Sequence, residues 1–214
     1  MRDLRHTGAD LDRVRKLFVH LIIGSGNAWS QGKRADDLAA NRKSAGEWLA
    51  LLEETRLLAR LDRDRTAEMK ASSDLRSQPK IFASDHGLIT AFSAHPEPLD
   101  MPDVRGRVFE AVIFRHLRDL ARAAGGHLSF ARLANDLELD FVVRYPGRTV
   151  GIEVTSSKDA TPRKLGRAAE IMRKLGIDLK LLIHGGFVSA RTGDIDVVPL
   201  HEFLLEPQRY AGGK

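Results

Sequence analysis

At 214 residues, with 43% hydrophobic and 29% charged residues, the chain has the composition of a globular protein and the length for two small hydrophobic cores. It contains no cysteine, which excludes disulfides, thiolate metal sites and cysteine nucleophiles, and no apolar run approaches the roughly 20 residues that span a bilayer. The net charge of +5, carried mostly by residues 101–214, is compatible with a nucleic-acid partner. We therefore expect a cytoplasmic protein with no membrane partner.

The first half of the chain predicts three helices followed by a loose hairpin. Apolar residues recur at helical spacing over residues 10–23, and a shorter helix is expected at about 33–40. A third helix follows Asn41, with Ser44 and Glu47 at the spacing of a capping box. Two β-prone segments come after it, separated by a polar stretch, at residues 57–61 and 80–83. This is the layout of a winged helix-turn-helix, which we expect over residues 1–93.

Direct DNA reading by this domain is one of two alternatives. Arg42 and Lys43, at the start of the third helix, are the candidate nucleic-acid contacts. Glu47, Glu53 and Glu54 lie farther along the same helix, and carboxylates are repelled by phosphates. The alternative is that the domain packs against the rest of the chain or against a partner.

The second half predicts a mixed α/β domain, so that the fold class is α+β overall. Residues 94–103 contain three prolines and are expected to be a linker, with the second domain at 104–206 and a short tail at 207–214. The predicted order is a helix at 104–124, three meandering strands, a basic helix at about 162–175 and two further strands. The helix between strands should form a right-handed crossover.

The centre of this domain is a predicted hairpin that carries two carboxylates. Alternation places the following residues of the first strand on one apolar face: Leu137, Leu139, Phe141 and Val143. Asp140 and Glu153 are then expected on the opposite face, side by side on neighbouring strands, where they would suit a hard cation such as Mg²⁺. The alternative is a solvated pair of carboxylates that form salt bridges with Arg144 or Arg148.

This pair resembles the signature of the restriction-endonuclease-like nucleases, an Asp on one strand and a Glu-x-Lys on the next. The matching residues are Asp140 and Glu153-Val154-Thr155, so that a threonine occupies the lysine position. The resemblance implies that Asp140 and Glu153 are catalytic and bind a metal, and that Glu110, on the preceding helix, leans toward the same metal. Lys158 is the candidate for a displaced catalytic lysine.

The order of several short motifs resembles a larger unit, the C-terminal region of a group of bacterial and archaeal AAA-type ATPases. The motifs are Lys80-Ile81-Phe82 with Asp85-His86-Gly87-Leu88, Gly106-Arg107-Val108-Phe109-Glu110, and Glu138-Leu139-Asp140-Phe141-Val142 with Ile152-Glu153-Val154. The resemblance covers residues 10–205 and implies a winged-helix part followed by a restriction-endonuclease-like part. No GxxxxGK[ST] loop occurs in the chain, so we expect no ATPase activity and no bound nucleotide.

Three functions remain open. In the first, a nuclease-like domain with weakened catalysis serves in DNA binding or protein interaction. In the second, Glu110, Asp140 and Glu153 bind Mg²⁺ and, with Lys158, form an active nuclease. In the third, the chain is a free-standing regulatory remnant whose partner is a separate ATPase or a second copy of the chain. Three cations of the basic helix, Arg163, Lys164 and Arg167, are further candidate nucleic-acid contacts.

Overall fold

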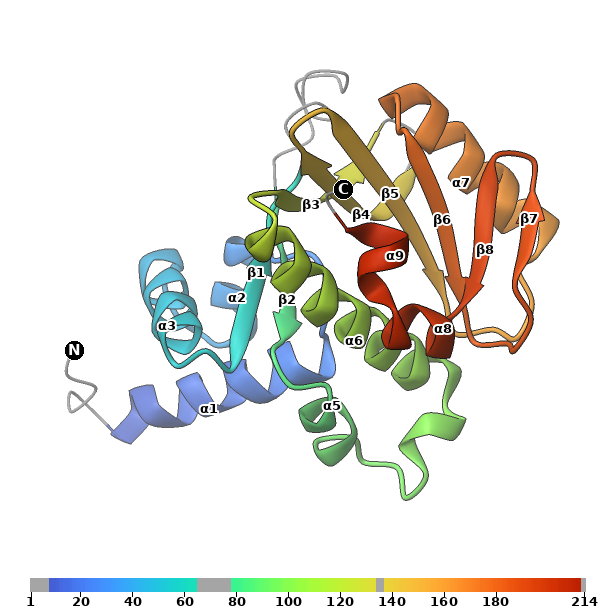
Figure 1. Ribbon diagram of the computed structural model, residues 1–214. Coiled ribbons are helices and arrows are strands. Elements are labelled where there is room, and N and C mark those ends of the chain that lie inside the picture. Colours follow the sequence, from blue (N-terminus) through green and yellow to red (C-terminus); the bar gives the residue numbers. More distant parts are fainter. Residues whose placement is uncertain (1–7, 65–77, 134–136, 213–214) are drawn as a thin grey trace. The chain divides into compact units, whose positions relative to one another are not determined.

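The computed structural model describes residues 8–64, 78–133 and 137–212 of the chain (Figure 1). They belong to two compact units. The first unit consists of Met1–Arg60 and Gln78–Ala111, and the second of Leu61–Ser77 and Val112–Lys214. The predicted linker, residues 94–103, contains a 3-10 turn and the first residues of the helix that follows. None of the described helices has the length and apolar character needed to cross a membrane.

The first unit contains the predicted helices and one small sheet. Its helices are α1 (Gly8–Ile23), α2 (Gln31–Asp37), α3 (Arg42–Glu54), α5 (Gly87–Ala91) and the 3-10 turn η1 (Pro98–Asp100). Helix α3 begins one turn earlier than the capping-box spacing predicts, because Asn41 and not Ser44 is its N-cap. The Asn41 side chain accepts a hydrogen bond of 2.8 Å from the main-chain N–H of Ser44, which satisfies one of the free donors at the helix start.

The small sheet pairs β1 (Leu58–Leu61) with β2 (Lys80–Ala83), as the two β-prone segments predict. The chain between α1 and α2 also runs along β2. Trp29 donates to the carbonyl of Pro79, and Ile81 exchanges main-chain hydrogen bonds with Gly26 and Asn27. Residues 26–29 therefore extend the sheet on the side of β2 opposite β1. Backbone pairing thus connects the segment between α1 and α2 to the β1–β2 hairpin.

The core of the first unit lies where α1 contacts α3, α5 and β2. Its largest fully buried side chains are Leu17, Ile22, Leu49, Ile81, Phe82 and Ile89. Leu11, which the helical periodicity places on the buried face of α1, is instead 52% exposed. It lies near the start of the helix, and the buried stripe begins at Val14.

The second unit is built on a six-stranded mixed sheet in the order β3-β4-β5-β6-β8-β7. Its strands are β3 (His127–Arg132), β4 (Glu138–Tyr145), β5 (Arg148–Thr155), β6 (Leu179–His184), β7 (Ala190–Thr192) and β8 (Ile195–Pro199). The first three strands form the predicted antiparallel meander, and β6 is parallel to both β5 and β8. This confirms the predicted mixed sheet. The exposed strand β7 is too short to leave a periodic signal in the sequence.

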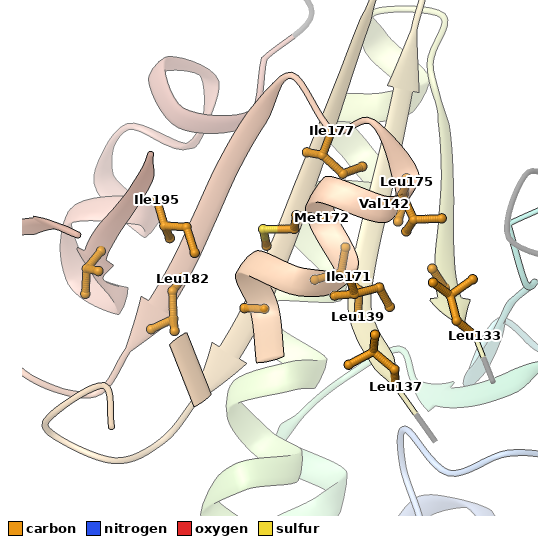
Figure 2. Close-up of a cluster of buried hydrophobic side chains, with 13 residues drawn as sticks. Leu133, Leu137, Leu139, Val142, Ile171, Met172, Leu175, Ile177, Leu182 and Ile195 are labelled. Atoms are coloured by element: carbon orange, nitrogen blue, oxygen red, sulfur yellow. The ribbon is translucent and has the colours of Figure 1, made fainter. Parts of the chain in front are cut away.

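Helix α7 (Pro162–Leu175) is the crossover between β5 and β6 and covers one face of the sheet. Its bounds match the predicted basic helix because both ends carry strong signals: Thr161 is the N-cap, Pro162 the first residue, and Gly176 the left-handed C-cap with φ 68°. Figure 2 shows the apolar cluster that it forms with the sheet, in which Ile171 and Met172 face Leu139 and Val142. All four side chains are fully buried.

The other face of the sheet is covered by the second half of α6 (Pro102–Ala123), together with α8 (Leu200–Leu205) and α9 (Pro207–Ala211) (Figure 1). The ring of Phe114 on α6 stacks on that of Phe141 on β4, with their centroids 6.5 Å apart. The Tyr145 hydroxyl donates to the Ala211 carbonyl and fixes α9 at the end of β4. Because helices cover both faces, the central strands are apolar on both sides.

One edge of this sheet is completed by a segment from far away in the sequence. Phe130 of β3 donates to the carbonyl of Asp62 and accepts from the N–H of Asp64. The Asp64 carboxylate receives two hydrogen bonds from the Arg144 guanidinium, at 2.7 and 3.1 Å. Only 2% of the Asp64 side chain is exposed, against 30% of the Arg144 side chain, so the carboxylate is held away from solvent. Arg144 therefore pairs with Asp64, not with Asp140 or Glu153 as in the solvated-pair alternative.

Candidate functional site

Asp140 and Glu153 occupy neighbouring positions where the β4–β5 ladder ends. The last residues that pair across the two strands are Phe141 and Ile152, and the two carboxylates are the next residue on each strand. The adjacency expected from the hairpin is therefore present. Both side chains are half-buried.

A β-bulge in β4 changes the faces on which its side chains lie. Ser129 of β3 pairs with Val142, but Ala131 pairs with Leu139, so β4 has one more residue than β3 over this interval. Leu139 and Val142 consequently both face α7, whereas Phe141 lies against α6. The predicted simple alternation, with Leu139 and Phe141 on one face, is wrong at this point. Bulges are common beside functional sites because they redirect a side chain.

Asp140 lies within this bulged interval, between Leu139 and Phe141. Its Oδ2 atom accepts a hydrogen bond of 2.8 Å from the main-chain N–H of Val154 on β5. The carboxylate thus satisfies a strand N–H at the end of the ladder and is fixed against the residue that follows Glu153. Its orientation is set by the backbone of the neighbouring strand, which favours a preorganised acidic group.

Glu153 lies on the α7 face of the sheet and forms an ion pair with Lys164 of that helix. It is in register with Leu182 of β6, which belongs to the cluster under α7, so the two side chains share this face. The Lys164 amine lies 3.4 Å from Glu153 Oε1 and also donates to the carbonyl of Val154. Glu153 is 14% and Lys164 32% exposed at the side chain, so the pair is only partly screened by water.

Lys164 is in the first turn of α7, a position that is unfavourable for a cation. The helix dipole is positive at this end, and the nearby carboxylate of Glu153 offsets the repulsion. From the sequence alone, Lys164 is a predicted nucleic-acid contact and Lys158 the predicted displaced lysine. The structure instead brings Lys164 to Glu153. The signal in the sequence was the N-cap Thr161 with Pro162, which fixes where the helix begins relative to the strand.

Lys158 lies in the loop after β5 and is exposed. Its main-chain carbonyl accepts a hydrogen bond of 2.8 Å from Nδ1 of the buried His184, at the end of β6. Gly185 donates to the carbonyl of Ser157, and a Cβ added to Gly186 would collide with the Lys158 carbonyl. The loops that follow the parallel strands β5 and β6 are therefore packed closely together, at the strand ends where open α/β sheets bind ligands.

Thr155 occupies the position of the lysine in the motif, and its side chain forms a local hydrogen bond. Its hydroxyl accepts from the N–H of Ser157, at 3.3 Å, in the turn that leaves β5. It is in register with His184 on the adjacent strand. A neutral hydroxyl supplies no positive field, so the cation at this site is the one carried by α7.

Glu110 belongs to the first unit, on the first half of α6. There its carboxylate lies against the turn after α1: a Cβ on Gly26, whose φ is 85°, would be 2.9 Å from Glu110 Oε2. Among the described residues, no three His, Asp or Glu side chains gather closely enough to hold a metal. The role of Glu110 as a ligand remains a prediction.

The other predicted nucleic-acid contacts are on the surface of their own units. Arg42 and Lys43 are exposed at the start of α3, where the Lys43 amine is 4.0 Å from Glu47. Arg163 and Arg167 are exposed on α7, on either side of Lys164 in the sequence.

Comparison with known protein families gives two matches in succession. Residues 105–203 match DUF4143. This domain of unknown function is found in C-terminal regions associated with AAA-type ATPases, which confirms the coarse part of the resemblance. Residues 1–98 match a second domain of unknown function, DUF8612. The DUF8612 match ends within the predicted linker, and the DUF4143 match begins two residues after it.

No curated protein matches the chain. Among solved structures, the crystal structure of protein VC1899 from Vibrio cholerae is similar over 98% of this chain, with 11% sequence identity and a TM-score of 0.34. The chain spans 59% of that protein's length.

Proposed function

We propose that the second unit is a metal-dependent nuclease-like site in which Asp140, Glu153 and Lys164 act together. The observation that carries the proposal is the ion pair between Lys164 and Glu153. The motif of the resembling nucleases needs two acidic residues and one amine. The chain lacks a lysine at position 155, but it supplies an amine from α7 to the same carboxylate.

The two carboxylates fit a small hard cation. Mg²⁺ prefers oxygen ligands and keeps several waters, so one or two protein carboxylates are a usual number. Asp140 and Glu153 would hold it. When bound, the metal would supply positive charge that polarises a phosphate and stabilises the charge of its transition state.

The remaining roles belong to the side chains of this unit. The Lys164 amine is positioned by Glu153 and by the Val154 carbonyl, so it would meet a phosphate oxygen without further ordering of its side chain. Its charge would favour the negative charge that builds up on that phosphate. Arg163 and Arg167, which are exposed on the same helix, would bind neighbouring phosphates of the nucleic-acid strand.

The architecture of both units supports the finer assignment that the resemblance implies. In the second unit a helix, a three-stranded meander, a crossover helix and a parallel strand follow in the order expected for a restriction-endonuclease-like domain. In the first, three helices and a small sheet extended by residues 26–29 are typical of a winged helix. Arg42 and Lys43 are the contacts through which this first unit would bind DNA.

A second candidate function is favoured by the hydrogen bond that Asp140 accepts and by the threonine at position 155. Asp140 Oδ2 already accepts from Val154, and the motif lysine is a threonine. A site of this kind with weakened catalysis would bind nucleic acid without cutting it, or serve as a module for a separate ATPase or a second copy of the chain.

The first test is isothermal titration of Mg²⁺ and Mn²⁺ into the full chain and into an Asp140→Asn/Glu153→Gln double variant. The asparagine keeps an oxygen that can accept from Val154, so the variant removes charge with little change in strand pairing. We expect saturable binding by the native chain and none by the variant, with matching circular dichroism spectra.

Cleavage of fluorescent single- and double-stranded DNA and RNA in Mg²⁺ or Mn²⁺ then separates the two candidates. Metal binding with cleavage supports the active site, and metal binding without cleavage supports the weakened module. No metal binding by the folded native chain excludes a metal-dependent nuclease.

A further inference from the structure

The loop between β6 and β7 presents two large apolar side chains to solvent. The Phe187 side chain is 78% and the Val188 side chain 76% exposed, although phenylalanine and valine are usually buried in folded proteins. They are consecutive and follow the strand that ends at His184 after two glycines. Single exposed apolar residues are common, but an adjacent pair at a loop tip indicates a contact surface.

Both ends of this loop are held in place. At its start, Gly185 donates to the carbonyl of Ser157 at 2.9 Å, and Gly186 lies against the Lys158 carbonyl. At its end, the Ser189 hydroxyl donates to Glu202 of α8 at 2.6 Å, a bond that also keeps the pKa of Glu202 below its ordinary value. The tip is therefore preorganised, and little entropy remains to be lost when a partner binds.

The surroundings of Phe187 indicate what that partner is. Its ring lies 6.0 Å from the ring of the exposed His201, which leaves most of its surface open. The exposed Lys158 belongs to the loop that packs under Gly186, next to the acidic Asp159. The cation of Lys164 is at the end of the same strand β5. An aromatic ring, with lysines on the adjoining loop and on the helix that follows it, is a combination that binds unpaired bases together with their phosphates.

We propose that Phe187 and Val188 form a stacking platform for an unpaired base of a nucleic-acid strand that runs past the carboxylate site. The inference rests on the proposed function. The loop after β6 is at the same edge of the sheet as the site, because the parallel strands β5 and β6 both end there (Figure 1). It adds a substrate class: single-stranded nucleic acid, or a duplex end with unpaired bases. Stacking tolerates any sequence, since every base has a flat face.

The test uses the full chain and fluorescent single-stranded oligonucleotides, one of them with abasic sites in place of its bases. We expect Phe187→Ala to weaken binding of the normal strand roughly 10-fold and to leave binding of the abasic strand unchanged. Leu205→Ala is the matched control, because Leu205 is 79% exposed in the same unit and lies outside this loop. A Phe187→Trp variant should bind as the native chain does, with its added tryptophan fluorescence quenched by the normal strand only.

The outcomes separate this inference from the proposed function. Equal binding of the normal strand by the native and Phe187→Ala chains would overturn the platform and leave the metal site standing. If no chain binds either oligonucleotide, the nucleic-acid function fails as a whole. If instead Phe187→Ala converts a concentration-dependent dimer to a monomer in light scattering, the two side chains are an interface between copies and the platform is wrong.

Discussion

The amine of Lys164, on the first turn of α7, lies 3.4 Å from Oε1 of Glu153 on β5. Eleven positions separate the two residues, so no local strand motif describes the pair. It forms because the N-cap at Thr161 starts the crossover helix where its first turn overlies the end of the strand. An amine is thus brought to Glu153 from a different element, while position 155 is a threonine.

This relationship predicts opposite effects of one substitution on metal binding and on cleavage. Lys164→Met removes a cation that competes with a metal for Glu153, so Mn²⁺ should bind at least as tightly as to the native chain. Cleavage should fall about 100-fold, because the amine no longer meets the phosphate. Titration calorimetry and an oligonucleotide cleavage assay measure the two effects. Lys158→Met is the matched control, and an equal loss of cleavage in that variant would contradict the assignment.

The ion pair between the buried Asp64 and the half-buried Arg144 should be important for stability. Arg144→Met leaves the Asp64 carboxylate, 2% exposed, without its two guanidinium hydrogen bonds, and we expect a loss of about 3 kcal/mol in the free energy of unfolding. Urea denaturation followed by circular dichroism measures it. Lys180→Met, which removes a pair with the exposed Asp194, should change stability by about 0.5 kcal/mol or less. Similar losses in both variants would show that the 61–64 segment is not held by this pair.

Two glycines should respond in opposite directions to the same substitution. Gly186→Ala places a Cβ against the Lys158 carbonyl and the His184 ring, and we expect a destabilisation of about 2 kcal/mol from this overlap. Gly166→Ala, in the middle of α7, meets nothing within 4 Å and should stabilise the chain by about 0.5–1 kcal/mol. Thermal unfolding of both variants is the measurement. A Gly186→Ala variant with the same thermal stability as the native chain would mean that the loops after β5 and β6 are not packed as described.

The alkaline limit of stability should depend on Tyr145. Burial raises the pKa of its hydroxyl above the ordinary value of 10.0, so the unfolded chain loses this proton before the folded chain does. The contribution of Tyr145 is therefore complete below pH 10 and is lost as the pH rises through the raised pKa of the folded state.

Tyr145→Phe tests this expectation. The variant should be less stable at neutral pH by about 1 kcal/mol, since the hydrogen bond to Ala211 is lost, but its stability should fall less steeply above pH 10. Unfolding midpoints measured between pH 8 and 11 give both quantities. Parallel curves for the two chains would mean that the hydroxyl is not buried at α9.

Much of this fold was predictable because its signals are local. Alternating apolar residues and the turn at Gly147 predict the hairpin of β4 and β5, and thereby bring Asp140 next to Glu153. Thr161, Pro162 and Gly176 mark the two ends of α7. These patterns depend on neighbours within one or two turns of the chain, so a sequence read without a structure contains them in full.

The tertiary structure decided what depends on register and on distant residues. The bulge in β4 turns Phe141 to the opposite face from Leu139, and strand periodicity does not record where an extra residue is accommodated. Asp64 reaches Arg144 across 80 residues, and Lys164 rather than Lys158 reaches Glu153, because helix and sheet pack in one particular alignment. The sequence by itself determined the acidic pair and the elements that carry it. Only packing decided which cation joins that pair, since an amine acts through its position in space and not through its spacing along the chain.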